Sequence, residues 1–240
     1  MLVIITHSGT SLIDPASLKS GSSSFPLSNS LECSASIWSP DNSQLYLCKS
    51  SSIKRYTPTE CLLEDLYYGS DTVTCMEMKG NSNILFLAAA SKVWSLDCTR
   101  SPGRVISSLE PHKNTVTRIS MSNDGTLLAS VSSSTVFVHN LTLSSHTQLK
   151  GLPERKPITC CLFHQHFRTK LLLGVGHDLL VYDSMRPSGP LKGVRIPESG
   201  DIVGVATSPF SKTLVAVVTS NGDVVLVDLD KDNGYVAPRD

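Results

Sequence analysis

One pattern recurs along the chain at nearly constant spacing. It consists of a short apolar run, a polar turn, a longer apolar run, a small or polar turn, and a third run ending near an Asp; DIVGVATSPFSKTLVAVVTSNGDVVLVDLD, from Asp201 to Asp230, is a clear copy. Equivalent anchors lie 40, 43, 42 and 44 residues apart, at Cys33, Val73, Val116, Ile158 and Ile202. This is the period of a propeller blade, so we predict an array of blades.

Each run within a copy has the composition of a β-strand. The runs are rich in Val, Ile, Leu and Thr and are bounded by Gly, Asn, Asp, Ser or Pro. SPDN at Ser39–Asn42 and SNDG at Ser122–Gly125 predict tight hairpin turns. One such sheet cannot bury both faces alone, so neighbouring copies must stack. We therefore predict an all-β chain with a β-propeller fold; in the alternative, a β-sandwich, strands do not recur as units at a fixed long period.

The copies divide the predicted single domain, residues 1–240, into about six blades. The first copy is partial: it reads LVII, a THSG turn and TSLID ending at Asp14, without an inner strand. A closed propeller joins both chain ends in a shared blade, so we expect a shortened form of a seven-bladed parent. Its open blade edges predict self-association. The copies span 1–27, 31–66, 71–109, 114–152, 156–194 and 201–240.

Composition and charge restrict the class of partner. The chain is 40% hydrophobic and 18% charged, which is ordinary for a globular protein. Lys plus Arg and Asp plus Glu both number 21, and this balance argues against nucleic acid or an acidic membrane as partner. No apolar run is long enough to span a membrane, and MLVIITHSG lacks the features of a signal peptide. We expect a cytoplasmic protein with protein partners.

The seven cysteines are predicted to be free thiols. They are odd in number, contain no C-x-x-C spacing, and mostly lie inside apolar runs, where a free Cys behaves as a small hydrophobe. We therefore predict neither disulfides nor a cysteine metal site.

Three stretches resemble sites of chemistry but lack required residues. DLDKDNG, from Asp228, has Asn and Arg where a calcium loop needs Gly and Glu. His164 and His166 in FHQHFR could bind a metal, but they fall in a predicted exposed turn without a third ligand nearby. GVGHD, from Gly174, precedes a strand instead of the helix that a phosphate loop needs. We predict no metal, no cofactor and no enzyme activity.

The copies resemble the WD-repeat family. Where that family ends its third strand in Trp-Asp, this chain has VYD, LVD, LID, VWS and VHN, at Asp183, Asp228, Asp14, Trp94 and His139. The family's Gly-His is retained only as PHKNTV around His112. The resemblance implies that this His would lock the blade through an Asp in the turn between the second and third strands. That turn has serines at Ser132–Ser134 and no acid, so the lock is expected to be missing.

Five segments resemble a narrower group, the NEDD-type WD-repeat proteins that target the gamma-tubulin ring complex to centrosomes and spindle poles. They are SLEPHKNTVT, LLASVSS, NLTLSSHTQLKG, HFRTKLLLGVG and GVATSPFSKTLVAVV. In that group the propeller binds recruiting partners, while a helical C-terminal region binds gamma-tubulin complexes. This sequence has no such region, so the resemblance implies the recruitment half alone.

The loops of a propeller are its expected binding surface. Loops entering each inner strand and loops joining the second and third strands should share one face. The residues expected there, several of them basic and matched to an acidic partner, are His112, Lys113, Arg155, Lys156, His177 and Asn221. The opposite face is expected to carry Asp41, Asn123, His164 and Arg168.

Two functions of different classes fit such a fold. The favoured one is a non-catalytic scaffold, with spindle-pole or gamma-tubulin components among its expected partners; a general WD-repeat adaptor in another assembly is the alternative. A propeller hydrolase would need acidic and His residues converging from the inner strands. The runs TVTRISM, PITCCLF and DIVGVAT contain almost none of these residues, which favours the scaffold.

Overall fold

The computed structural model contains only β-structure in the part of the chain that it describes. The backbone is described for residues 2–6, 9–13, 25–28, 33–60, 62–80, 82–154, 156–196, 200–231 and 235–236, and side chains within these ranges from 33 to 231. Contacts divide the chain into two compact units, and each is described by itself. Unit 1 comprises Met1–Ala90 and Trp94–Ser108, and unit 2 comprises Ser91–Val93 and Leu109–Asp240. The prediction of one domain remains a prediction.

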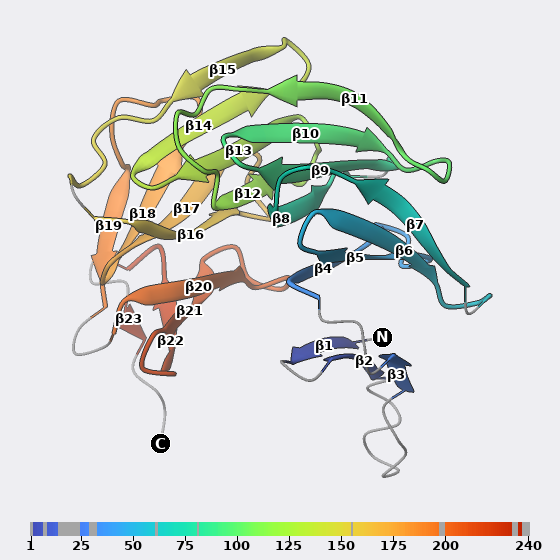
Figure 1. Cartoon of the computed structure of the whole chain (residues 1–240). Helices are drawn as coiled ribbons and strands as arrows, with labels where there is room; N and C mark the ends of the chain where they lie inside the picture. The colour runs from blue at the N-terminus through green and yellow to red at the C-terminus, as the bar shows by residue number, and fades with distance from the viewer. Residues whose placement is uncertain are drawn as a thin grey trace. The chain divides into compact units, whose positions relative to one another are not determined.

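Each predicted copy forms one sheet whose strands follow chain order (Figure 1). The first sheet has three strands, β1 (Leu2–Thr6), β2 (Gly9–Ile13) and β3 (Phe25–Ser28). The other five sheets have four strands each: β4 (Ala35–Trp38), β5 (Leu45–Lys49), β6 (Ser52–Thr57) and β7 (Leu62–Tyr68); β8 (Val73–Met78), β9 (Ile84–Ala89), β10 (Lys92–Asp97) and β11 (Arg104–Leu109); β12 (Arg118–Met121), β13 (Leu127–Ser132), β14 (Thr135–Asn140) and β15 (Ser145–Gln148); β16 (Ile158–Phe163), β17 (Lys170–Val175), β18 (Asp178–Asp183) and β19 (Lys192–Arg195); and β20 (Ile202–Thr207), β21 (Leu214–Thr219), β22 (Val224–Asp228) and β23 (Tyr235–Val236).

The inner strand of a sheet begins in the same irregular way in several copies. A register shift follows the apolar anchor between Val73 and Cys75, between Ile158 and Cys160, and between Ile202 and Gly204. A Thr after the anchor donates its hydroxyl to a carbonyl of the second strand in three copies, at Thr74, Thr117 and Thr159. The recurring bulge explains why one extra residue separates the anchor from the regular ladder.

The Asp or Asn that ends the third strand shapes the turn that follows. A carboxylate or amide oxygen accepts a backbone N–H two residues further on in four copies, and this bond closes an Asx-turn. The four residues are Asp97, Asn140, Asp183 and Asp228. In these four copies the Asp or Asn that ends the third strand is therefore a local turn former.

Apolar side chains on both faces of β17 hold three sheets together in unit 2. Leu171 and Leu173 are fully buried in a cluster shared with sheet β12–β15. Leu172, also fully buried, belongs to a second cluster shared with sheet β20–β23. Because successive side chains of a strand point to opposite faces, sheet β16–β19 packs between its two neighbours. This packing explains the uninterrupted apolar run LLLGV that follows Lys170.

Unit 1 has an equivalent core between sheets β4–β7 and β8–β11. Tyr46, Ile53 and Leu66 from the first sheet pack with Leu85 and Leu87 from the second, and all five are fully buried. No helix within the described ranges is long and apolar enough to span a membrane.

Six of the seven cysteines have described positions, and these six are free thiols. Four of them, Cys33, Cys48, Cys98 and Cys160, are buried among apolar side chains. Cys61 lies outside the described residues.

Leu173→Ala should lower the free energy of unfolding by about 2–5 kcal/mol, because it removes a fully buried side chain and leaves a cavity. Leu143 is 72% exposed, and Leu143→Ala should change stability by no more than about 0.5 kcal/mol. Urea unfolding of both variants measures the difference. Equal midpoints would show that the packing around β17 is wrong.

Candidate interaction surface

His112 lies in the interior of unit 2, which corrects its prediction as a loop-surface residue. Its side chain is buried, with Nε2 2.8 Å from Ser130 Oγ on β13. The same hydroxyl lies 2.8 Å from Nε2 of His139 on β14, and Thr135 Oγ1 lies 3.4 Å from His112 Nδ1. The Phe137 ring packs edge-on against the His112 ring. No acid is among these partners of His112, as predicted, but the hydroxyl groups of Ser130 and Thr135 bond the ring in its place.

His112 and His139, which both bond to the Ser130 hydroxyl, are neutral at pH 7. We call this three-residue contact the His112–Ser130–His139 tie. Burial lowers the pKa of His112 to about 4. Burial also lowers the pKa of His139 to about 3, with smaller electrostatic contributions from the nearby His146 and His112. A serine between two imidazoles is a pattern of nucleophilic catalysis, but the Ser130 side chain is completely buried. The contact is a structural tie, and His112 is not available to a partner.

Two of the predicted loop residues meet carboxylates. Lys156 Nζ lies 3.5 Å from Asp178 Oδ2, and Arg195 Nη1 lies 3.5 Å from Asp178 Oδ1. His177 Nε2 lies 3.7 Å from Asp201 Oδ1. The structure thus brings loops from sheets β16–β19 and β20–β23 together. The basic residues there alternate with the carboxylates of Asp178 and Asp201, so they do not form a purely basic patch.

The other predicted loop residues are dispersed. Lys113 is exposed and has no ion-pair partner among the described residues. Arg155 lies outside the described residues. Asn221 lies beside Gly200, since its Oδ1 would be 2.7 Å from a Cβ placed there. The partner-binding role of the whole set remains a prediction.

A pocket of about 440 Å³ opens where three inner strands of unit 2 begin. We call it the inner-strand pocket. The strands β12, β16 and β20 all contribute to its lining, together with the turn after β13. The lining residues are Thr117, Arg118, Ser133, Pro157, Ile158, Thr159 and Val203. None of them was selected from the sequence.

Arg118 could have been found by aligning the copies. Counted from the anchors, its equivalents are Ala35, Cys75, Cys160 and Gly204, all small residues. A lone Arg in a column of small residues is a visible anomaly. A search of the run TVTRISM for carboxylates and imidazoles alone does not point to Arg118.

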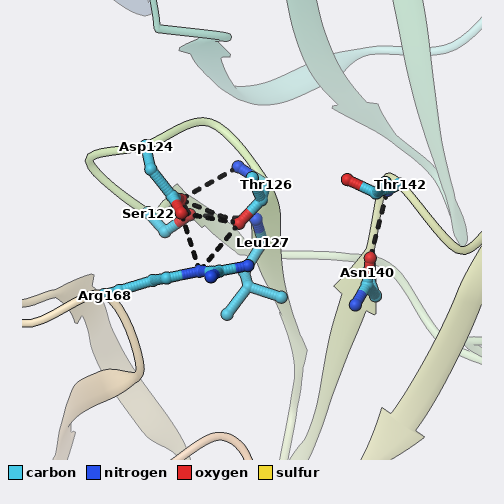
Figure 2. Close-up of polar contacts among 7 residues, drawn as sticks. All are labelled: Ser122, Asp124, Thr126, Leu127, Asn140, Thr142 and Arg168. Carbon is cyan, nitrogen blue, oxygen red and sulfur yellow. Dashed lines mark hydrogen bonds and ion pairs between the residues drawn. The ribbon is translucent and has the colours of Figure 1, made fainter.

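The hairpin turns at the other end of these strands carry a bridge between sheets (Figure 2). Asp124 Oδ1 accepts a hydrogen bond from Ser122 Oγ at 2.7 Å, and Asp124 Oδ2 lies 2.7 Å from Arg168 Nε. Arg168 Nε also donates to Thr126 Oγ1. Although burial alone would raise it, hydrogen bonds from Ser122 and Thr126 and the charge of Arg168 lower the pKa of Asp124. Arg168 therefore joins the β16–β17 turn to the β12–β13 turn.

Two of the other residues expected on the opposite face, Asn123 and Asp41, lie in hairpin turns. Asn123 and Asp41 are exposed, and Asp41 accepts hydrogen bonds from Ser39 and Ser43 in a turn of the same design as Ser122–Thr126. These bonds, led by that from Ser39, lower the pKa of Asp41 to about 2.

His164 corrects the prediction that both histidines of FHQHFR are exposed. Its side chain is completely buried, and its Nδ1 accepts the backbone N–H of His166 at 3.1 Å, as a side-chain oxygen does in the sister turns. Burial lowers its pKa. His166 Nε2 lies 2.9 Å from the carbonyl oxygen of Ser208. Within the described ranges, no group of three His, Cys, Asp or Glu side chains is arranged to hold a metal ion.

Comparison with known proteins bears on the fold. No protein-family model matches the chain, and no curated protein matches it. Among solved structures, it is similar to a chain in the crystal structure of the mitotic checkpoint complex, with a TM-score of 0.78 and 14% sequence identity. The match covers 94% of this chain and 71% of that chain. The predicted fold class, all-β with successive four-stranded antiparallel sheets of the kind that form propeller blades, is confirmed. An identity this low shows the fold alone.

The buried histidines should make the protein sensitive to acid. Unfolded histidines bind protons near pH 6.5, whereas folded His112 and His139 do so only near pH 4 and pH 3. The unfolded state therefore holds more protons between these values, and stability should fall as the pH drops below about 6.5. The slope should be at most about 1.4 kcal/mol per pH unit for each histidine.

Urea unfolding between pH 7 and pH 4.5 measures this slope. Burial raises the pKa of Glu77 to about 7, which acts in the opposite direction over the same range, so the comparison must be between variants. His139→Gln should have a shallower loss of stability with acid than the wild type, whatever its absolute stability. Parallel pH profiles would show that His139 is not held neutral by the fold.

Proposed function

We propose that the chain is a non-catalytic protein-interaction scaffold. The observation that carries this proposal is the open inner-strand pocket, where apolar surface at Val203 lies in the same lining as the exposed cation Arg118. Exposed apolar surface beside a charge is typical of a site that another molecule covers. The sheets of unit 2 that carry this lining pack against one another through shared buried clusters, which hold it in place.

Within that class, we propose recruitment of the gamma-tubulin ring complex to centrosomes or spindle poles, from a cytoplasmic pool, for microtubule nucleation. Support comes from the five segments that resemble the NEDD-type proteins. Additional support comes from the likeness to a chain of the mitotic checkpoint complex, in which the same fold takes part in a multiprotein assembly. A general adaptor in another assembly remains the alternative.

A propeller hydrolase has weaker support in the inner strands. Among β4, β8, β12, β16 and β20, the described residues include a single carboxylate, that of Glu77 on β8, and no imidazole. Burial raises the pKa of Glu77 to about 7, but no second carboxylate or histidine on these strands accompanies it. The proposal therefore assigns no catalytic residue.

A pull-down from dividing-cell extract tests the scaffold, with the tagged chain as bait and mass spectrometry as readout. We expect gamma-tubulin complex or spindle-pole proteins to be enriched. The double variant Lys113→Glu, Arg155→Glu should recover less of them if the predicted loop residues contribute. Arg186→Glu reverses one charge, half the charge change of the double variant, at an exposed site beyond the far end of β18, and should recover as much as the wild type.

The outcomes separate the two levels of the proposal. Specific recovery of other proteins without any gamma-tubulin component would refute the finer proposal and leave the general adaptor. No specific recovery by the wild-type chain would contradict the scaffold itself. Equal melting temperatures of the variants are the control for folding, because exposed loop charges change stability by only about 0.5 kcal/mol.

A further inference from the structure

We propose that the inner-strand pocket binds an acidic peptide segment of a partner protein, with an apolar side chain inside the pocket and a carboxylate on Arg118. This inference rests on the proposed scaffold function and specifies the chemistry of the segment that the scaffold holds. All residues involved belong to unit 2.

The apolar part of the lining comes from two neighbouring inner strands and the segment before one of them. Pro157 and Val203 are exposed, Val203 to 46%, whereas Ile158, which follows Pro157 in the sequence, is buried at 5%. The pocket volume of about 440 Å³ lies within the usual range for ligand pockets, about 300–1,000 Å³. An inserted aliphatic or aromatic side chain would cover Val203 and Pro157, which the chain itself leaves in contact with solvent.

Arg118 gives the pocket its charge. Its guanidinium Nη1 donates to the carbonyl oxygen of Thr117 at 2.7 Å, and no carboxylate of the described residues forms an ion pair with it. By contrast, Lys156 and Arg195 nearby share Asp178. The remaining N–H donors of Arg118 form a planar fork that matches a carboxylate. Charge complementarity therefore favours an acidic group on the occupant.

The position of Arg118 in the repeat indicates that packing does not require an arginine there. Arg118 pairs with Val131, just as Cys75, Cys160 and Gly204 pair with the second strands of their own sheets directly after the bulge. Those three sheets form with a small residue at this position. Arg118 therefore adds a charged group that the local fold does not need.

The combination of one cation and an apolar lining favours a peptide over a nucleic acid. Binding to nucleic acid relies on several Lys or Arg side chains that neutralise successive phosphates. The pocket contains a single Arg, and the chain carries no net charge. A free inorganic anion would use Arg118 but would leave the apolar lining exposed.

Selection from a random peptide library on the immobilised full chain tests the proposal. We expect enriched peptides to share an Asp or Glu close to a large apolar residue. Fluorescence polarisation with one enriched peptide should show affinity about tenfold or more weaker for Arg118→Ala than for the wild type. Arg118→Ala introduces the residue that the equivalent position 35 already has, so the fold should tolerate it.

Three comparisons identify the contact. Arg118→Lys should restore part of the affinity, and Arg186→Glu should bind like the wild type. Replacing the peptide's acid by its amide should weaken binding to the wild type but not to Arg118→Ala. Val203→Asp should weaken binding through the apolar half.

Several results would overturn the proposal. They are enrichment of peptides without acidic residues, equal binding by Arg118→Ala, and binding of a labelled RNA or DNA oligonucleotide that competes with the peptide. Failure of the proposed function is distinguishable from failure of the pocket. If Arg118→Glu recovers the same partners as the wild type from cell extract, the scaffold stands and the pocket is not its docking site.

Discussion

Hydrogen bonds that span one repeat length hold neighbouring sheets in register. In unit 2, Phe163 N donates to Ser120 Oγ at 2.9 Å, and Thr159 Oγ1 shares its one hydrogen between the carbonyl oxygen of Gly174 in its own sheet and that of Ile202 in the next. In unit 1, Arg55 Nη1 donates to the carbonyl oxygen of Cys98 at 2.8 Å. Each pair that joins two sheets lies 43 residues apart, which is one repeat. Apolar faces alone tolerate sliding, whereas directional bonds do not, so the inner-strand pocket and the Asp124–Arg168 bridge depend on this register.

The fold could be predicted from the sequence because its determinants are local and repeated. The anchors from Val73 to Ile202 mark the inner strands, and Asp183 and Asp228 mark the ends of the third strands, where they close turns with neighbouring backbone. A turn of this kind needs only residues close in sequence. Each strand or turn signal is weak by itself, but its recurrence about every 40–44 residues identifies the repeat.

The candidate site was less predictable, because it depends on contacts between strands that a single line of sequence does not show. Ser130 lies in the strand run LLASVS, and nothing around it indicates that it bonds to two histidines from other segments. His164 lies in a turn, where exposure is the ordinary expectation, yet its ring replaces the turn's usual oxygen acceptor. Arg118 was visible only in comparison with its equivalents in the other copies.

The tie between His112, Ser130 and His139 has a direction. When Thr135 Oγ1 donates its hydrogen to the carbonyl oxygen of Ser132, 2.9 Å away, it accepts from His112 Nδ1, which then carries the ring's hydrogen. His112 Nε2 is then an acceptor for the Ser130 hydroxyl, and His139 must donate from its own Nε2. In this arrangement the backbone carbonyl of Ser132, in the β13–β14 turn, gives the two rings opposite tautomers: His112 carries its hydrogen on Nδ1 and His139 on Nε2. The Ser132 carbonyl thereby determines which nitrogen of His139, on β14, is protonated.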